Sequence, residues 1–173
     1  MRKKPYITPQ NKLKHFEWYR EKVGWGSKWK QIVFSDEEDG QGGARYYWHD
    51  ILNEERFFSK HHSGVRTVMI WAAFSSKGKS KLAYISPCST AEGYKAILSS
   101  YLKLSLRRIG GKKTTFMHDN APIHKVSTIK TWFQSNEISV LDWYLYSSYF
   151  NPIENVWRHL LLKFTQKEIN SIQ

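Results

Sequence analysis

Two acidic residues in the last third of the sequence have the types and positions of metal ligands. Asp119 follows an apolar run that ends at residue 118, and Glu154 stands near the start of a later helical pattern. The 34 residues between them leave room for a helix, a strand and a loop, so folding can bring both side chains together. Carboxylates that share divalent cations support phosphoryl transfer. The sequence therefore predicts a metal site for this chemistry, provided that a third acid joins the pair.

Asp36 is the candidate for the third acid. It follows the apolar run 32–34, which predicts a strand buried on both faces, and it precedes Glu37, Glu38 and Asp39. Ligands of open α/β sheets gather at the carboxyl ends of strands, so we choose the acid nearest the expected strand end. Oxygen ligands without Cys or clustered His favour Mg²⁺ or Mn²⁺ over Zn²⁺.

Each acid also has an ordinary structural explanation. Asp36 can be one of several solvated acids in a turn, and Asp119 can simply form a turn. Glu154 lies three residues after Asn151, where a Glu closes a capping box, although it also borders the apolar stripe of its helix and can lean toward the sheet. The pattern alone leaves a metal-dependent nuclease as one hypothesis among several.

Two histidines, His118 and His124, flank the turn after Asp119. Neither has metal-ligand spacing to a second strong ligand, so we expect a surface position or a contact to a metal ligand.

The elements that must position these residues predict a mixed α/β domain. Expected strands cover 29–35, 45–49, 67–74, 81–86, 114–118 and 139–143. The short connections among the first four predict an antiparallel meander, and the helices between the later strands predict parallel pairing with the first. Helices are expected over 11–23, 89–109, 120–133 and from 151 onward.

Local signals set the expected helix ends and faces. Ser89 with Glu92 predicts a capping box, and Asn120 is expected to cap the helix that follows it. The helix over 11–23 is expected to lay aromatic side chains on the domain, with Phe16 and Trp18 among them. Inward faces of the helices are expected at Leu13, Phe16, Tyr19 and Val23, and at Val126, Ile129, Trp132 and Phe133.

Composition favours a nucleic-acid partner. The 173 residues carry a net charge of +12, and residues 1–30 hold nine Lys or Arg against two acids. Such an excess favours nucleic acid first and an acidic membrane second, although a basic run can also be a solvated helix face. No signal peptide or membrane span is expected, and the single Cys88 allows no internal disulfide, so we expect an intracellular protein. Arg107–Arg108 with Lys112–Lys113, or Arg2-Lys3-Lys4, could serve in nuclear import.

Five blocks, in this order, resemble the catalytic domain of Tc/mariner-superfamily transposases. The blocks are IVFSDE (32–37), YYWHD (46–50), SGVRTVMIWAAFSSKGKSKLAYI (63–85), FMHDNAPIH (116–124) and NPIENVW (151–157). The final Glu and the 34-residue spacing resemble the Tc-like branch. The resemblance implies an RNase H-like α/β fold over 29–173, preceded by a basic linker arm over 1–28.

The resemblance also implies a function. It makes Asp36, Asp119 and Glu154 a DDE triad that holds two Mg²⁺ or Mn²⁺ ions, cuts both strands at transposon ends and joins the freed 3′-OH to target DNA. DNA is the implied partner, a homo-oligomer on DNA is compatible with it, and the nucleus is the implied location.

Four departures from the family pattern shape the expectations. The sequence begins after the usual helix-turn-helix region, the loop after Asp36 is short, and 147–150 reads SSYF where the family is close to SPDL. The family also continues past residue 173 with more helix, so a C-terminal truncation is expected. We therefore expect a truncated or decayed copy that retains the three residues of the triad. The rival hypotheses are a catalytically inactive module that binds nucleic acid, and an RNase H-like nuclease for RNA–DNA hybrids.

Overall fold

A computed structural model of the chain describes residues 8–39, 69–86, 90–110, 114–143 and 150–170, with side chains of the last helix up to residue 163. The expected strand 45–49, the altered segment 147–149 and Ser89 lie outside the described residues. No helix among the described residues has the length and apolarity that a bilayer crossing requires.

The described strands form one mixed sheet in the order β3-β2-β1-β5-β6, with β4 also paired to β2. β1 pairs antiparallel with β2 and parallel with β5, and β5 pairs parallel with β6. This confirms the predicted antiparallel start and the parallel later strands. The bounds are β1 Ile32–Asp39, β2 Met69–Ser75, β3 Gly78–Lys79, β4 Ala83–Ile85, β5 Thr115–Met117 and β6 Ser139–Val140.

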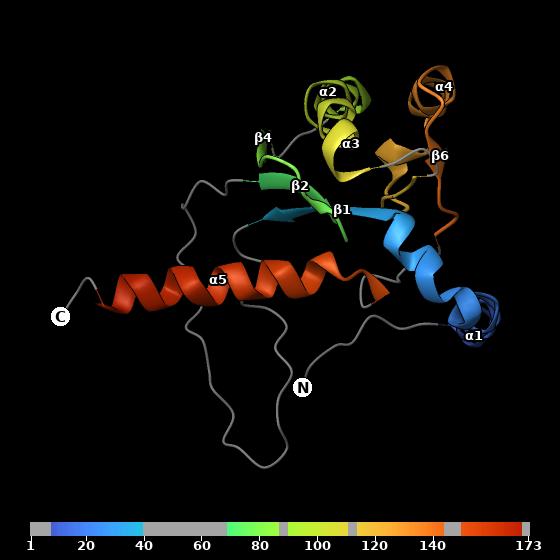
Figure 1. Cartoon of the computed structure of the whole chain (residues 1–173), viewed down its shortest axis with the longest axis horizontal. Coiled ribbons are helices and arrows are strands. Elements are labelled where there is room, and N and C mark those ends of the chain that lie inside the picture. Colours follow the sequence, from blue (N-terminus) through green and yellow to red (C-terminus); the bar gives the residue numbers. More distant parts are fainter. Residues whose placement is uncertain (1–7, 40–68, 87–89, 111–113, 144–149, 171–173) are drawn as a thin grey trace, which may run out of the picture.

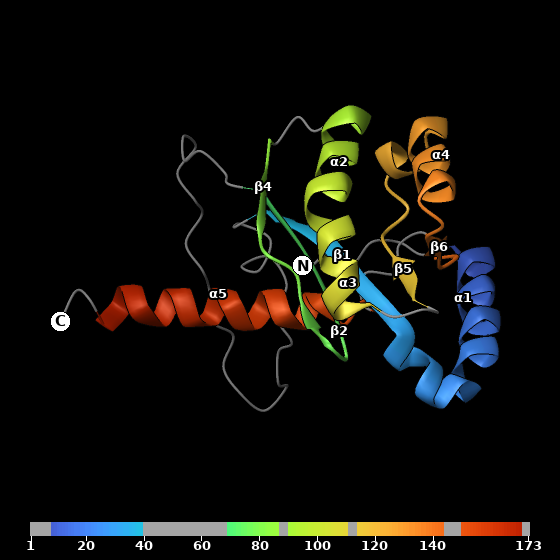
Figure 2. The ribbon, with the colours of Figure 1, turned by 45° about the horizontal axis from the view of Figure 1, so that its top comes forward.

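Helices cover both faces of this sheet (Figure 1). α2, α3 and α4 lie on one face, while α5 runs along the other, and α1 stands beside the β5–β6 end (Figure 2). The bounds are α1 Pro9–Lys22, η1 Val23–Gln31, α2 Ala91–Ile97, η3 Leu98–Leu102, α3 Lys103–Ile109, η4 Pro122–His124, α4 Ser127–Ser135 and α5 Ile153–Asn170. η3 is a π-helical turn that makes α2 and α3 one continuous rod.

Two apolar clusters hold the layers together. The first joins the sheet to α2, α3 and α4 through residues such as Val33, Trp71 and Phe116. The second lies on the other face and includes Trp18, Phe34 and Trp143. Trp18 is 8% exposed, and its indole N–H donates to the Asp142 carbonyl at 3.1 Å, so α1 is attached to the domain.

The first strand is longer than predicted, and this corrects the reason for choosing Asp36. Antiparallel pairing with β2 continues from Phe34 through Asp39, because each acid has a backbone partner in β2. Asp36 therefore lies inside the strand, opposite Ala72, and not at its end. The acids are tolerated in a strand because alternate side chains can point to different faces.

Several helix ends also differ from the predictions. The N-cap of α2 is Thr90, whose hydroxyl accepts from the Gly93 N–H at 3.2 Å. Asn120 caps no helix; its amide donates to the Trp143 carbonyl instead. Val126 precedes α4 and is exposed, whereas the other three inward positions of that helix are buried as predicted.

The apolar face expected for the first helix is wrong. Leu13, Phe16, Tyr19 and Val23 are exposed, and the helix buries His15 and Trp18 instead. Of the two aromatic residues expected on the domain, Trp18 is there and Phe16 is not. Partners from distant segments decided this, because Trp18 packs on Trp143 and Phe150.

Candidate metal centre

The two faces of β1 separate its first two acids. Ile32 and Phe34 belong to the cluster on the α1 side, and Val33 belongs to the cluster under α2. Since side chains alternate along a strand, Asp36 points to the α5 side and Glu37 points to the α2 side. The interactions of each residue agree with this division.

Asn151 connects the beginning of α5 to β1. Its side-chain oxygen accepts from the Ile153 N–H at 3.3 Å, which confirms Asn151 as the predicted helix cap. Its amide donates to the Ser35 carbonyl at 3.2 Å and to Asp36 Oδ2 at 3.5 Å. One buried side chain thus fixes the first turn of α5, which carries Glu154, against the strand that carries Asp36.

Asp36 and Glu154 form an acidic pair on this face. Burial first, and then the charges of Glu37 and Glu154, raise the pKa of Asp36 well above its usual value. Burial also raises the pKa of Glu154, although a hydrogen bond with Asp36 opposes this rise. Each group is therefore held in an environment that disfavours its ionised form in the absence of a cation.

Asp119 lies just beyond β5, the parallel neighbour of β1. Phe34 pairs with Met117 at the end of the register, and Asp119 follows Met117 by two residues, as Asp36 follows Phe34. Asp119 Oδ1 accepts from the Ala121 N–H at 2.8 Å and lies 2.7 Å from His124 Nδ1. Its charge raises the pKa of both Asp36 and Glu154. The three predicted ligands are therefore electrostatic neighbours.

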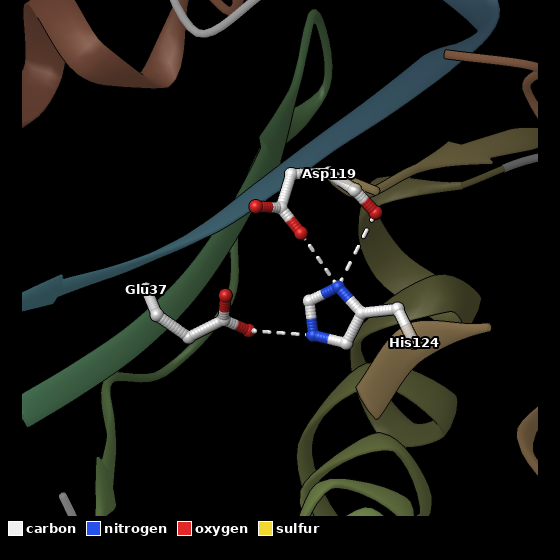
Figure 3. Close-up of side chains that lie close together, drawn as sticks. All are labelled: Glu37, Asp119 and His124. Carbon is white, nitrogen blue, oxygen red and sulfur yellow. Dashed lines mark hydrogen bonds and ion pairs between the residues drawn. The ribbon is translucent and has the colours of Figure 1, made fainter. Parts of the chain in front are cut away.

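His124 stands between two carboxylates (Figure 3). Its Nδ1 faces Asp119 Oδ1 and also lies 3.3 Å from the Asp119 carbonyl, while its Nε2 lies 3.6 Å from Glu37 Oε1. The ring is 4% exposed and packs against Tyr94 with the two ring planes tilted, at a centroid distance of 4.1 Å. Potential ligand atoms of Glu37, Asp119 and His124 all lie within 4.8 Å of one another.

The charges of Glu37, Asp119 and His124 compensate one another. Burial opposes ionisation of Asp119, but hydrogen bonds from His124 and from the Ala121 N–H outweigh it and lower the Asp119 pKa. Burial likewise disfavours a charged His124, yet Asp119 and Glu37 together raise its pKa. Burial raises the pKa of Glu37 to about 7, while His124 acts in the opposite direction. An imidazolium between two acids is thus stabilised on both sides.

The neutral ring of His118 also packs against His124. The pKa of His118 falls to about 3, because burial and the neighbouring His124 both disfavour its charged form. Its Nδ1 lies 3.0 Å from the Tyr94 hydroxyl, and its ring stacks on His124 at 4.8 Å. His118 and Tyr94 therefore form an uncharged wall that leaves His124 few orientations.

The structure brings the sequence-predicted residues together in two groups. Asp36 and Glu154 share a hydrogen bond, and Asp119 acts on both through its charge. Among the described residues, however, the group with ligand atoms within 4.8 Å contains Asp119 with Glu37 and His124. The sequence missed the role of Glu37; for His124 it left open a surface position or a contact to a metal ligand, and the structure shows the contact, to Asp119. The alternation of β1 could have assigned Glu37 to the opposite face, but only the turn at 121–123 brings His124 back onto Asp119.

The carboxylates near Asp36 suit hard divalent cations. Carboxylate oxygens are the ligands that Mg²⁺ and Mn²⁺ prefer. Burial, and after it the charges of neighbouring carboxylates, raise the pKa values of Asp36 and Glu154, and a bound cation would favour their ionised forms. Asp119 is 48% exposed at its side chain, so an ion could reach it from solvent. The residues present thus fit the cofactor that the family resemblance implies.

Comparisons with known proteins agree with this geometry. The family described as DDE superfamily endonuclease matches residues 31–172. The Tc3 transposase of Caenorhabditis elegans is 36% identical over 161 residues, which are 91% of this chain and 48% of that protein. The Tcb2 transposase of Caenorhabditis briggsae is 30% identical over 168 residues, 91% of this chain and 61% of that protein. The chain spans about half to three fifths of the length of these relatives.

Solved structures support the fold. The catalytic domain of the Mos1 mariner transposase superimposes with a TM-score of 0.64 at 17% identity, covering 98% of this chain and 84% of that one. A Mos1 paired-end complex with the left transposon end gives a TM-score of 0.68 at 16% identity, over 99% of this chain and 57% of that one. At such identities the match establishes the RNase H-like fold. Because the family match covers most of the chain, the chain belongs to the DDE superfamily endonucleases and carries a catalytic domain of the Tc/mariner transposase type.

Proposed function

We propose that this domain catalyses divalent-metal-dependent cleavage and strand transfer of DNA, with Asp36, Asp119 and Glu154 as the metal ligands. The observation that carries the proposal is the pairing of Asp36 with Glu154 beside Asp119. Residues 118 positions apart are held together by Asn151, at the cost of two raised carboxyl pKa values. Buried carboxyl groups whose surroundings raise their pKa are typical of a metal or catalytic site.

The proposed ligands would hold Mg²⁺ or Mn²⁺, with two ions expected from the family resemblance. Bound ions would activate the attacking water or 3′-OH and stabilise the leaving oxygen at the scissile phosphate. The chain's own contribution is to fix the three carboxylates: β1 holds Asp36, the Asn151 cap holds Glu154, and hydrogen bonds hold Asp119. Positioning and charge supply most of the catalysis in phosphoryl transfer.

The proposed partner is DNA. The net charge of +12 and the Mos1 complex with a transposon end support this partner. We further propose that residues 1–28 form a basic arm along the DNA, that the protein acts as a homo-oligomer there, and that it works in the nucleus. Phosphate binding by Lys and Arg makes affinity fall steeply with salt.

Nicking of supercoiled plasmid tests the proposal. The 173-residue chain is incubated with Mg²⁺ or Mn²⁺, alongside chains carrying Asp119→Asn and Glu154→Gln. Metal-dependent nicking by the wild type that both variants lose would support the assignment. Equal nicking by wild type and both variants would contradict it, because a contaminating or metal-independent nuclease would then be responsible.

A catalytically inactive nucleic-acid-binding module is the second candidate. The specific observation in its favour is that the tight group of ligand atoms joins Asp119 to Glu37 and His124, not to Asp36 and Glu154. Thermal unfolding with added Mn²⁺ separates the two candidates. Salt-sensitive DNA binding without any metal-dependent shift in Tm would favour the inactive module, and a metal shift that Glu154→Gln removes would favour the enzyme.

A further inference from the structure

We propose that His124 is a positioning residue for Asp119, and that Glu37 in turn fixes His124, so that a Glu–His–Asp relay sets the orientation of one metal ligand. The inference rests on the proposed function, because it takes Asp119 to be a ligand. It adds Glu37, which the sequence did not assign to the site, and gives His124 a specific role there.

The contacts of Asp119 carry the first step. Its Oδ1 lies 2.7 Å from His124 Nδ1 and receives the Ala121 N–H at 2.8 Å. A carboxylate can only accept, so the His124 Nδ1 must be the protonated donor. With two donors on one oxygen, the carboxylate cannot rotate freely, although the side chain is 48% exposed. Oδ2 is then left with a defined direction for an ion.

The surroundings of the ring carry the second step. His124 Nε2 is buried and has Glu37 Oε1 at 3.6 Å as its acidic neighbour. Tyr94 and His118 pack against the ring, with centroid distances of 4.1 Å and 4.8 Å. The imidazole is therefore held by two carboxylates at its nitrogens and by two neighbouring aromatic rings. Such partners of a metal ligand typically change metal affinity by about 10–100-fold when removed.

The same three residues could instead bind a metal ion directly. Direct binding at Nδ1 would break the 2.7 Å contact with Asp119, and an ion at Nε2 would lie on the far side of the ring from Asp119 Oδ1 (Figure 3). The contact between His124 Nδ1 and Asp119 Oδ1 therefore favours the relay over direct metal binding by the ring. Zn²⁺, which prefers imidazole, serves as the probe for this alternative.

The test uses two isosteric substitutions that separate the two ring nitrogens. The amide nitrogen of Asn occupies the position of Nδ1, and that of Gln the position of Nε2. We expect His124→Asn to bind Mn²⁺ within about 3-fold of the wild type in calorimetric titration, and His124→Gln to bind about 10–100-fold more weakly. His159→Asn, an exposed position on α5, is the matched control. Circular dichroism and Tm of each variant confirm folding.

A double-substitution cycle tests the role of Glu37. Glu37→Gln is expected to weaken Mn²⁺ binding several-fold in the wild type and to have no effect in the His124→Asn background, where no side chain reaches Glu37. In the metal-free chain, ¹H–¹⁵N spectra of the imidazoles should show a hydrogen-bonded Nδ1 proton of His124 that Asp119→Ala removes.

The outcomes distinguish the inference from the proposed function. If the wild type and Asp119→Asn both fail to bind Mn²⁺, the proposed function is contradicted and the relay falls with it. If the wild type binds and Asp119→Asn does not, but His124→Gln binds like the wild type, the relay alone is overturned. Tight Zn²⁺ binding that requires Glu37 and His124 but not Asp119 would also overturn it, in favour of a direct site.

Discussion

The acids on the two faces of β1 lie in different electrostatic surroundings. On the α5 side, Asp36 meets Glu154, and both carboxyl pKa values are raised. On the α2 side, Glu37 and Asp119 share one histidine, and the pKa of Asp119 is lowered. Among the described residues, His124 offsets the charges of two carboxylates on the α2 side, whereas on the α5 side burial and neighbouring carboxylates raise the pKa of Asp36 and Glu154. The difference shows that a buried acid keeps a low pKa only where a cationic partner or hydrogen-bond donors face it.

The largest expected effect separates the faces by activity. Glu154→Gln should reduce metal-dependent nicking by at least about 10³-fold, because it removes a proposed ligand. Glu37→Gln should reduce it by no more than about 10²-fold, since Glu37 acts through His124. Rates on supercoiled plasmid in Mg²⁺ measure both. Equal losses in the two variants would remove the distinction between ligand and supporting residue.

The next effect concerns stability on the α2 side. His124→Ala should lower the free energy of unfolding by about 2–4 kcal/mol, because it leaves a cavity beneath Tyr94 and removes the partner of two acids. Urea unfolding in a chelator measures it. The exposed His159→Ala serves as the control and should stay within about 0.5 kcal/mol of the wild type. A small loss for His124→Ala would mean that the ring contributes little to this face.

Added metal should stabilise the chain through the proposed ligands, Glu154 among them. At a Mn²⁺ concentration 100 times its Kd, the wild type should gain about 2.7 kcal/mol of stability. Glu154→Gln should abolish the gain, and in chelator the same variant should raise Tm by roughly 2–4 °C, because it relieves repulsion with Asp36. A metal-induced gain that survives Glu154→Gln would place the ion elsewhere.

The smallest effect is a pH dependence of the metal-free chain. Asp36, Glu154 and Glu37 have folded pKa values above their ordinary ones, so the unfolded chain loses protons first and stability falls as pH rises. For Glu37 this window extends from 4.5 to about 7. Asp119, whose pKa is lowered, adds stability above its ordinary value of 3.8, and His124, whose pKa is raised, adds stability that is lost as pH rises through its folded pKa.

Asp36→Asn is the variant that tests this dependence. It should flatten the fall in urea-unfolding free energy between pH 4.5 and 7 in chelator, because it removes one buried acid and the repulsion that it exerts. An unchanged slope would show that the acids on the α5 side are better solvated than their burial indicates.

Much of the architecture could be predicted from the sequence. The apolar run 32–34, the Asn151 cap and the alternation of later helices and strands predicted a mixed sheet with an antiparallel start and parallel later strands. These are local signals, since a buried strand or a helix cap can be recognised from a few neighbouring residues. The RNase H-like fold was likewise predicted, through the resemblance of five blocks to a known family.

Other features depended on contacts between distant segments. The length of β1 was set by pairing with β2, and the buried face of α1 was set by Trp143 and Phe150, so a helical pattern read alone pointed to the wrong side. His124 is another case: its sequence position is that of a turn residue, and its burial comes from Tyr94 above it.

The sequence by itself determined which acids were available, Asp36, Asp119 and Glu154, and the elements that carry them. Contacts between distant segments decided which of these acids lie on the same face of the sheet. Strand alternation turns Asp36 and Glu37 to opposite faces. The parallel pairing of β1 with β5 puts the turn that carries Asp119 beside β1, and the Asn151 cap holds the first turn of α5, with Glu154, against β1. The physical reason is that charge compensation depends on distance, so the same residue types form an unbalanced pair on one face and a balanced relay on the other.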